Sequence, residues 1–454
     1  MLLRRKAMKQ LENWRKSSRG STAILLEGAR RVGKSTLVKT FGKEQYESYI
    51  LVDFSELPTQ VRSIFEDESD ELDTFFMMLS TYYRTKLYNR SSLIIFDEVQ
   101  RYPKAREMVK RLVADGRYDY IETGSLVSIK QNVRDILIPS EEHAVALEPL
   151  DFEEFCWARG EELLAEAIVH AFEAGKGLPD PLHKRAMRLW REYLLVGGMP
   201  QAVVLYLETR DFGVVDAAKR DILSLYRNDI GKFGGSEAAR VRAVFNTIPG
   251  QLAKHEKKFT LAAIDANARS REYDSAFAWL EDARMVNLCR NCTDPSVGLE
   301  LSEESNSIKC YMADTGLLVA QSFADRAETP DDVYRSILFD RLSLNEGMLV
   351  ENAVAQQLKS AGHRLFFHSQ YKKGDSDHTL EIDFLVVRAY EDAAMRPRVS
   401  PIEVKSGRSY GTSSLNKFKG IFGKRVGIEY VLHPRQLTVV EGRVYLPLYM
   451  AFCL

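Results

Sequence analysis

Five short apolar runs alternate with helix-like segments over the first 150 residues. The runs lie at 23–26, 48–54, 93–96, 118–123 and 143–150. Helix-like segments lie between some of them, at 36–40 and at 66–90, and the first twenty residues favour a short basic helix. A chain that alternates strands with helices folds as a parallel sheet covered by helices. The pattern therefore predicts an α/β fold for this part of the chain.

Helical periodicity replaces that alternation from residue 151 to about 233. Glu and Ala, both good helix formers, dominate residues 153–174. Gly and Pro at 175–181 predict a loop, and a further helix is expected at 183–193. We expect this segment to form a helical, lid-like part of the molecule.

The segment from 239 to 290 suggests a winged helix. Its three helical stretches lie at 241–252, 261–268 and 271–283. The third would be the recognition helix if this domain binds nucleic acid. Five basic residues are candidate phosphate contacts: Lys254, Lys257, Lys258, Arg269 and Arg271. Packing against another domain is at least as good an interpretation, because residues 251–290 carry seven Lys and Arg against six Asp and Glu.

The composition is that of an ordinary globular protein, with 454 residues, 45% hydrophobic and 28% charged. A net charge of -1 means that any nucleic-acid binding must come from a local patch. Five cysteines give no disulfide framework, and the odd number fits a reducing compartment. The N-terminal residues lack the apolar core of a signal peptide, and no run of 18 apolar residues predicts a membrane span. We therefore expect a cytoplasmic protein with no membrane partner.

A phosphate-binding loop, Gly-x-x-x-x-Gly-Lys-Ser, stands at 28–35 between the first apolar run and a helix start. That context is the one the motif requires, because backbone N–H groups and the helix N-terminus then face the phosphates. Lys34 should reach the β- and γ-phosphates of ATP, and the Ser35 hydroxyl should ligate Mg²⁺. The residues expected at the nucleotide are Gly28, Ala29, Arg30, Arg31, Val32, Gly33, Lys34, Ser35 and Thr36.

Two carboxylates follow the third apolar run, at Asp97 and Glu98. A buried parallel strand that ends in acids is typical of a strand that meets a metal-bound nucleotide. Asp97 would hold Mg²⁺ through water, and Glu98 would orient or deprotonate the attacking water. Two solvated acids at a strand end are the alternative, which the phosphate loop upstream disfavours.

A polar strand end follows the next apolar run, at Thr123 and Ser125. In ATPases with an extra strand between the two Walker elements, a polar residue at this strand end contacts the γ-phosphate. Either residue is therefore a sensor candidate, and Ser125 could equally cap a helix. Arg101 and Arg134 are candidates for an arginine finger, and the sequence does not decide between them.

Helix-like and strand-like runs return in the last third of the chain. A helix is expected from 347 to 358, and strands are expected at 364–368, 380–387 and 400–407. Cys289-x-x-Cys292 has the spacing of zinc ligands, but the sequence holds no second pair to complete such a site.

Four charged residues on this helix and two of these strands carry candidate metal chemistry. Glu403 and Lys405 are two apart on one strand, so both project from the same face. Asp383 could come from the neighbouring strand of a hairpin, and two such carboxylates can hold a divalent cation while Lys405 positions water. Glu351 could orient a metal-bound water. A structural Glu–Lys pair on a solvated face is the alternative, which the apolar neighbours of Asp383 and Glu403 disfavour.

Taken together, the motifs resemble those of a family of prokaryotic AAA-type ATPases that carry a C-terminal domain of unassigned function. Besides the phosphate loop, the matching stretches are 94–103, 123–125, 149–155, 194–200, 312–318, 381–384 and 402–407. The order Glu, Asp, Glu-x-Lys in the last third is that of restriction-endonuclease-like nucleases. The resemblance covers nearly the whole chain.

The resemblance implies an α/β protein with a P-loop AAA-type core, a helical lid, a winged helix and a restriction-endonuclease-like α/β domain. We place these parts at 1–150, 151–236, 237–300 and 301–454. It gives nucleotide roles to Lys34, Ser35, Asp97 and Glu98. It also gives nuclease roles to Glu351, Asp383, Glu403 and Lys405, with Asp383 and Glu403 as ligands of Mg²⁺ or Mn²⁺.

We therefore expect an ATP-hydrolysing protein that acts on DNA, with a metal-dependent nuclease site near its C-terminus. The main alternative is a nucleotide-dependent switch or scaffold whose C-terminal domain binds nucleic acid or protein without cutting. A small-molecule kinase is a weaker third hypothesis, because the second half offers no obvious acceptor pocket. ATP and DNA are the expected partners, and a homo-oligomer is an option that the sequence leaves open.

Overall fold

The chain divides into two compact units in the computed structural model. The P-loop unit comprises Leu2–Glu148 and Asp282–Arg284, and the C-terminal unit comprises Met1, Pro149–Glu281 and Met285–Leu454. No helix among the described residues combines the length and the apolar character needed to cross a membrane. The structure describes residues 1–68, 71–124, 141–232, 235–254, 258–266, 268–326, 329, 331–338, 346–371, 379–388, 397–407 and 410–454.

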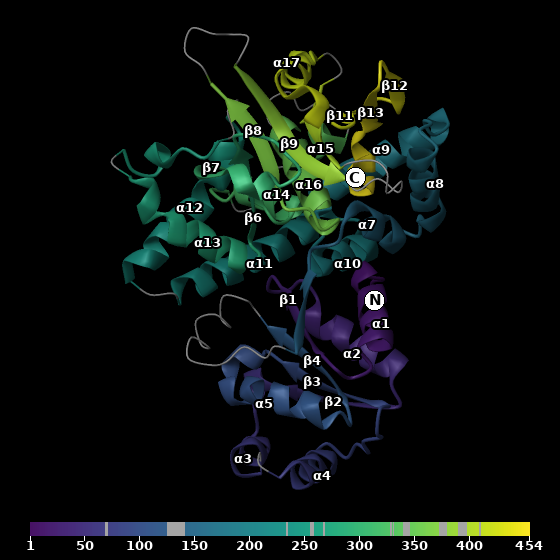
Figure 1. Cartoon of the computed structure of the whole chain (residues 1–454), viewed down its shortest axis with the longest axis vertical. Coiled ribbons are helices and arrows are strands. Elements are labelled where there is room, and N and C mark those ends of the chain that lie inside the picture. The colour runs from purple at the N-terminus through teal and green to yellow at the C-terminus, as the bar shows by residue number, and fades with distance from the viewer. Residues whose placement is uncertain are drawn as a thin grey trace. The chain divides into compact units, whose positions relative to one another are not determined.

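The P-loop unit alternates strands and helices (Figure 1). Its helices are α1 (Lys6–Ser18), α2 (Lys34–Gln45), α3 (Thr59–Asp67), α4 (Leu72–Tyr82) and α5 (Pro103–Asp115). Its strands are β1 (Ala23–Gly28), β2 (Ser48–Asp53), β3 (Ser92–Asp97), β4 (Asp119–Gly124) and β5 (Glu142–Leu147). The five predicted strands are thus confirmed, whereas the helix expected over 66–90 is α4 alone, with α3 ending at Asp67.

All neighbouring strands of this unit run parallel, in the order β2-β3-β4-β1-β5. The predicted parallel sheet is therefore confirmed. β4 lies between β1 and β3, so the ends of these three strands meet at one edge of the sheet. The phosphate loop follows β1, Asp97 ends β3, and Thr123 lies next to the end of β4. The topology thus gathers the predicted nucleotide residues at that edge.

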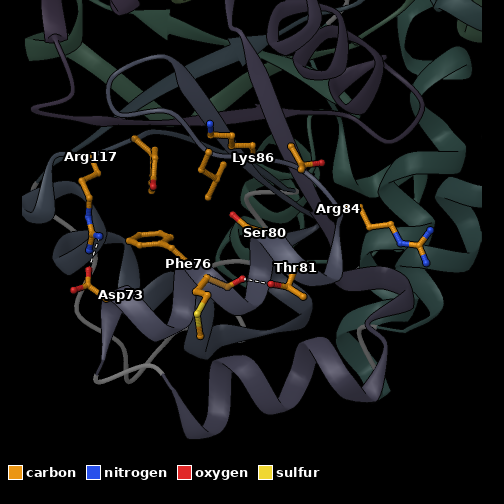
Figure 2. Close-up of a pocket in the computed structure, with 11 residues that line it drawn as sticks. Asp73, Phe76, Ser80, Thr81, Arg84, Lys86 and Arg117 are labelled. Atoms are coloured by element: carbon orange, nitrogen blue, oxygen red, sulfur yellow. Dashed lines mark hydrogen bonds and ion pairs between the residues drawn. The ribbon is translucent and has the colours of Figure 1, made fainter.

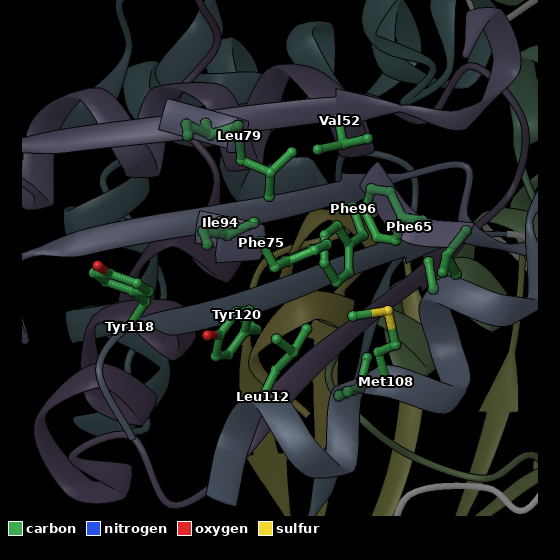
Figure 3. Packing of buried hydrophobic residues seen from close by; sticks show 14 of the residues in the cluster. Val52, Phe65, Phe75, Leu79, Ile94, Phe96, Met108, Leu112, Tyr118 and Tyr120 are labelled. Atoms are coloured by element: carbon green, nitrogen blue, oxygen red, sulfur yellow. The ribbon is translucent and has the colours of Figure 1, made fainter. Parts of the chain in front are cut away.

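A large aromatic core holds this sheet in place. Alternate residues of a strand point to opposite faces, and one face of β2, β3 and β4 packs against α3, α4 and α5. Figure 3 shows Phe65 and Phe75 from the helices beside Phe96 and Tyr120 from the strands. The ring centroids of Phe65 and Phe75 are 5.1 Å apart at an interplanar angle of 85°. Such edge-to-face pairs add stability beyond the buried area, by about 0.5–1.5 kcal/mol each.

The C-terminal unit begins with helices and ends with a mixed sheet (Figure 1). Its helices are α7 (Phe152–Ala158), α8 (Glu162–Glu173), α9 (Asp180–Val196), α10 (Pro200–Thr209), α11 (Phe212–Gly231), α12 (Gly235–Leu252), α13 (Asp274–Asp282), α14 (Thr315–Ser322), α15 (Asp331–Leu338), α16 (Glu346–Ser360) and α17 (Ser413–Phe422). Its strands are β6 (Val286–Cys292), β7 (Glu303–Met312), β8 (Phe366–Gln370), β9 (Leu380–Arg388), β10 (Arg398–Val404), β11 (Glu429–His433), β12 (Thr438–Val440) and β13 (Arg443–Pro447).

These eight strands form one sheet, in the order β12-β13-β11-β10-β9-β8-β6-β7. β8 and β10 each run antiparallel to β9, which lies between them, and β11 lies parallel to β10. Along the chain, the helix α16 comes first, the antiparallel strands β8, β9 and β10 follow, and the helix α17 then leads to the parallel strand β11. The helix α17 packs Leu415 and Phe418 against Ile382 of β9 and Val431 of β11.

Two of the motifs that carry the family resemblance meet in the C-terminal unit. Gly198 follows α9, and its backbone N–H donates to the Asp314 carboxylate at 2.5 Å, while its carbonyl accepts from the Leu150 N–H at 2.7 Å. A Cβ atom at position 198 would lie 2.0 Å from the Leu150 carbonyl oxygen, so only glycine fits. Asp314 also caps α14 through the Leu317 N–H. Gly198 of the Gly-Gly-Met-Pro motif and Asp314 of the Ala-Asp-Thr-Gly motif therefore have a structural role, because they hold these segments together.

Two helical predictions differ from the structure. The stretch 153–174 forms two helices, α7 and α8, because Gly160 between them takes a φ of +72°, which a helix does not allow. In the winged-helix segment, α12 and α13 are helical, but between them only Leu261–Ala263 and Ser270–Glu272 form short 3-10 turns among the described residues. The β6–β7 hairpin that follows joins the eight-stranded sheet. The four-part division of the chain stays a prediction.

Candidate functional site

The phosphate loop runs from the end of β1 to the start of α2. Gly33 caps the helix with a φ of +99°, a conformation that side chains with a Cβ rarely adopt. The Arg5 guanidinium, from the residue before α1, donates to the Val32 carbonyl oxygen at 3.2 Å and braces the loop from outside. Sequence reasoning did not single out Arg5, because nothing in its local sequence distinguishes it from the other basic residues of that helix.

Lys34 points back into this loop. Its Nζ donates to the carbonyl oxygens of Gly28 at 2.9 Å and Ala29 at 3.1 Å. Burial lowers the pKa of the Lys34 ammonium, and the carboxylates of Glu98 and Asp97 oppose that shift. A buried ammonium that binds only neutral carbonyl groups would gain by binding an anion at the same place.

Asp97 connects three elements at this edge of the sheet. The Ser35 hydroxyl donates to Asp97 Oδ1 at 2.9 Å, and the Thr123 hydroxyl donates to the same oxygen. Thr123 also accepts a hydrogen bond from the backbone N–H of Glu98 at 3.2 Å. The Thr123 side chain is fully buried, so solvent does not reach its hydroxyl group. Thr123 therefore fixes the position of both carboxylate residues.

Glu98 stands in the left-handed region, with a φ of +58°. Such a conformation is uncommon for a residue with a Cβ and often marks a functional position. The Gln100 side-chain amide donates to Glu98 Oε2 at 2.7 Å and orients its carboxylate. Arg101 ends the next 3-10 turn and is exposed. Ser125 and Arg134 lie outside the described residues.

Two half-buried ion pairs, made by one arginine from a distant part of the sequence, lie next to this loop. Arg284 binds Glu27, the residue before Gly28, at 3.1 Å and Glu148 at 2.8 Å. Burial lowers the pKa of Arg284, but the two carboxylates more than offset this and raise it. All three residues belong to the P-loop unit. The sequence gives no signal for this pairing, since 257 positions separate Arg284 from Glu27.

In the C-terminal unit the structure brings together the four predicted charged residues. Glu351 lies on α16, Asp383 on β9 and Glu403 on β10. The Lys405 ammonium is 2.8 Å from Glu403 Oε2, and Asp383 Oδ2 accepts from the Val404 N–H at 2.8 Å. Glu351 and Glu403 are buried. Sequence reasoning thus grouped residues that the fold does place in one cluster.

A fifth charged residue that the sequence did not reveal, Lys309 of β7, lies in the same cluster. Its Nζ is 2.7 Å from Glu381 Oε1, 3.5 Å from Glu351 Oε1 and 3.6 Å from Asp383 Oδ1. Tyr311, two residues on, donates to Glu351 Oε1 at 2.5 Å. The sequence does carry one signal for Lys309 and Tyr311: they are two polar residues, two positions apart, in the otherwise apolar stretch 308–313.

Burial and charge oppose each other in this cluster. Burial raises the pKa of the Glu403 carboxyl, while the hydrogen bond and charge of Lys405 pull it down. Burial lowers the pKa of Lys309, but the carboxylates of Glu351, Asp383 and Glu381 more than offset this and raise it. The pKa of Lys405 is likewise raised, because its pairing with Glu403 outweighs burial. Both lysines are therefore charged at neutral pH.

The donor set of this cluster fits a divalent cation in part. Glu403 Oε1 is buried and accepts no hydrogen bond from the described residues, which is an unused ligand position. Carboxylate oxygens are the ligands that Mg²⁺ and Mn²⁺ prefer. Among the described residues, however, no group of three or more His, Cys, Asp and Glu side chains is arranged to hold a metal ion. The lysine ammonium groups already lie close to these carboxylates, with Lys405 Nζ 2.8 Å from Glu403 Oε2 and Lys309 Nζ 3.6 Å from Asp383 Oδ1.

A hollow of about 450 Å³ lies on the P-loop unit beside α4. Figure 2 shows Arg117 and Asp73 pointing toward each other at its rim, where their charged atoms are 2.5 Å apart. Its lining comprises Asp73, Phe76, Met77, Ser80, Thr81, Arg84, Thr85, Lys86, Leu87, Arg117 and Tyr118. None of these residues belongs to the phosphate loop or to the carboxylates that face it, so this hollow does not coincide with the predicted nucleotide site.

The geometry of the P-loop unit is that of a nucleotide-binding P-loop domain, with its phosphate loop between strand and helix at the edge of a parallel sheet. Three models of protein families match parts of the chain. Residues 20–156 match the family model described as AAA domain. Two other models, each described as a domain of unknown function, match residues 187–328 (DUF8612) and 346–450 (DUF4143). No curated protein matches the chain.

Several solved structures overlap weakly with the chain. They include the Orc1 protein of Aeropyrum pernix in complex with DNA, at 12% identity over 72% of this chain and 94% of that chain, with a TM-score of 0.28. Cdc6p from Pyrobaculum aerophilum is 14% identical over 74% of this chain and 94% of that chain, with a TM-score of 0.26. AMPPCP-bound DnaA from Aquifex aeolicus is 13% identical over 62% of this chain and 87% of that chain, with a TM-score of 0.29. TM-scores this low carry no argument about the fold or the function of this chain.

Proposed function

We propose that the P-loop unit binds ATP together with Mg²⁺ and hydrolyses the nucleotide. The observation that carries this proposal is the 2.9 Å hydrogen bond between the Ser35 hydroxyl and Asp97 at the end of the phosphate loop. A hydroxyl and a carboxylate in contact at this place are the groups that would hold Mg²⁺, directly and through water. When bound, the ion would neutralise charge on the phosphate oxygens. Lys34, now bound to loop carbonyls, would turn to the phosphates.

Glu98 is the residue that we propose as the base or water-orienting group. Its carboxylate is oriented by Gln100, and its backbone is fixed by Thr123. A base must be held within hydrogen-bond reach of the proton that it takes, so this support is what the role requires. Thr123 is the sensor candidate that the structure describes, and its contact with Asp97 favours it for that role.

Lys34→Ala and Glu98→Gln together test this proposal. Lys34→Ala should abolish tight ATP binding, because the charge that offsets the phosphates is lost. Glu98→Gln should bind ATP normally and turn it over slowly, because it keeps the shape of the side chain but not the base. Lys39→Ala is the matched control, since Lys39 is an exposed lysine on the same helix. ATP turnover at the wild-type rate by Glu98→Gln would refute the role of Glu98.

We propose as a second function that the C-terminal unit is a restriction-endonuclease-like domain that cleaves DNA with Mg²⁺ or Mn²⁺. The order of α16, β8, β9, β10, α17 and β11 supports this proposal, because Asp383 and Glu403 then lie on adjacent antiparallel strands. The unused Glu403 Oε1 supports it as well. In this function Asp383 and Glu403 would hold the ion, Lys405 would orient the attacking water, and the ion would supply a nucleophilic bound water.

Linear, branched and single-stranded DNA, each with Mg²⁺ or Mn²⁺, should be tested for cleavage by the full chain. Asp383→Asn and Lys405→Ala should each abolish cleavage and leave ATP turnover largely unchanged. Asp325→Asn, at an exposed carboxylate of the same unit, is the control. If the wild-type chain cuts none of these substrates but binds them in a nucleotide-dependent way, the alternative of a switch or scaffold is favoured instead.

A further inference from the structure

Lys309 reaches the acidic cluster from outside the run of elements that holds the predicted nuclease residues. It lies on β7, which stands three places from β9 in the strand order. Strands three places apart in a flat sheet are about 14 Å apart. The Lys309 Nζ nevertheless lies 5.1 Å from the ring centroid of Phe367 on β8, and the carboxylate side chains of β9 cover part of the distance between the strands, with Glu381 Oε1 at 2.7 Å and Asp383 Oδ1 at 3.6 Å.

The environment of Lys309 is both buried and acidic. Its side chain is 1% exposed, and three carboxylates lie within 4 Å of its Nζ. With Glu403 and Lys405, the cluster holds four carboxylates and two ammonium groups. A buried carboxylate without a cation is unstable, so Lys309 stabilises Glu351 and Asp383 by its charge. It faces Asp383 Oδ1 while the Val404 N–H occupies Oδ2.

We propose that Lys309 is the built-in counterion of this site and that it sets the affinity of the site for a divalent cation. The inference rests on the proposed metal site at Asp383 and Glu403. A divalent ion at Asp383 would lie beside the Lys309 ammonium, and the two cations repel each other in a medium of low dielectric constant. The metal ion therefore has to displace Lys309 from Asp383, and its binding is weakened by the free energy of the lysine–carboxylate contact. Lys309 is a positioning residue, because it is too buried to touch a substrate.

The test is the binding of Mn²⁺ to the full chain, measured by calorimetry without nucleotide. Lys309→Met should bind Mn²⁺ more tightly than the wild type, by about tenfold or more, because one competing charge is gone. It should also unfold at a lower temperature without metal and regain much of that loss when Mn²⁺ is added. Lys309→Arg, which keeps the charge, should bind Mn²⁺ like the wild type.

Lys309→Met removes the ammonium group that lies within 4 Å of three carboxylates, so a second variant guards against failure to fold. The double variant Lys309→Met with Glu381→Gln removes one charge of each sign, and the net charge of the cluster stays the same. It should still bind Mn²⁺ more tightly than the wild type. Equal or weaker Mn²⁺ binding by the folded double variant, or no Mn²⁺ binding by any of these proteins, would overturn the inference.

The cleavage assay separates this inference from the proposed nuclease function. If the Lys309 variants bind Mn²⁺ more tightly and no form of DNA is cut, the inference holds and the nuclease proposal fails. If the wild type cuts DNA and the Lys309 variants show unchanged Mn²⁺ affinity, the nuclease proposal holds and the inference fails.

Discussion

Replacing Thr123 by valine removes one hydroxyl near the end of β4, beside the phosphate loop, and changes the volume of the side chain very little. In the wild type this hydroxyl donates to Asp97 and accepts from the Glu98 N–H. The bond to Asp97 is buried and the bond from Glu98 is partly buried, and the exposed fraction of Thr123 is 0%. The variant therefore leaves a carboxylate with one donor fewer and a backbone N–H without its partner.

The expected loss follows from these two bonds. A hydrogen bond to a charged group contributes about 1.5–3 kcal/mol, and a buried N–H left without a partner costs about 1–3 kcal/mol. Because the two contributions overlap at one atom, we expect the free energy of unfolding to fall by about 2–4 kcal/mol. Glu98 and Asp97 would then be held less firmly, and we expect the rate of ATP turnover to fall about 10- to 100-fold, or about 1.4–2.7 kcal/mol in activation free energy.

Steady-state ATP turnover at saturating ATP, nucleotide affinity and urea unfolding should be measured for Thr123→Val and for Thr123→Ser. The serine variant keeps the hydroxyl and loses only a methyl group, so it should retain most of the turnover rate. Nucleotide affinity should change much less than the rate in both variants, because Lys34 and the loop are intact. A valine variant with wild-type turnover and unchanged stability would show that Thr123 does not position these carboxylates.

Two further predictions concern stability. Gly198→Ala should lower the free energy of unfolding by about 3 kcal/mol, because its Cβ would lie 2.0 Å from the Leu150 carbonyl oxygen. Gly250→Ala is the control and should be neutral or slightly stabilising, because a Cβ at that position would meet nothing within 4 Å. Equal urea midpoints for the two variants would contradict this expectation. Burial raises the pKa of Glu122, which faces Arg106 and Glu142, from 4.5 to about 8. A carboxyl group whose pKa is raised on folding contributes stability below its unfolded pKa and loses it as the pH rises, so wild-type stability should fall between pH 5 and pH 8 by about 3 kcal/mol relative to Glu122→Gln. Parallel pH profiles for these two proteins would rule out this role of Glu122.

Local sequence patterns determine the P-loop unit to a large extent. The apolar runs predict its five strands, and the spacing from Gly28 to Ser35 predicts the loop, because both depend on residues adjacent in the chain. Asp97 and Glu98 can also be predicted from the sequence, since carboxylates that end a buried strand are costly unless a cation or a hydrogen-bond donor meets them. In the C-terminal unit the Glu-x-Lys spacing at 403–405 works in the same way, because it fixes two side chains on one face of a strand.

Only the tertiary structure decides which distant side chains complete these sites. Thr123 is one of two sensor candidates in the sequence, and its hydrogen bonds with Asp97 and Glu98 come from the placement of β4 between β1 and β3. Lys309 enters the acidic cluster because β7 and β9 belong to one sheet in which the side chains of Lys309, Glu381 and Asp383 meet, a contact that spacing along the chain cannot predict. The physical reason is the same in both cases: strand order and sheet geometry, rather than local periodicity, determine which charges share a buried volume.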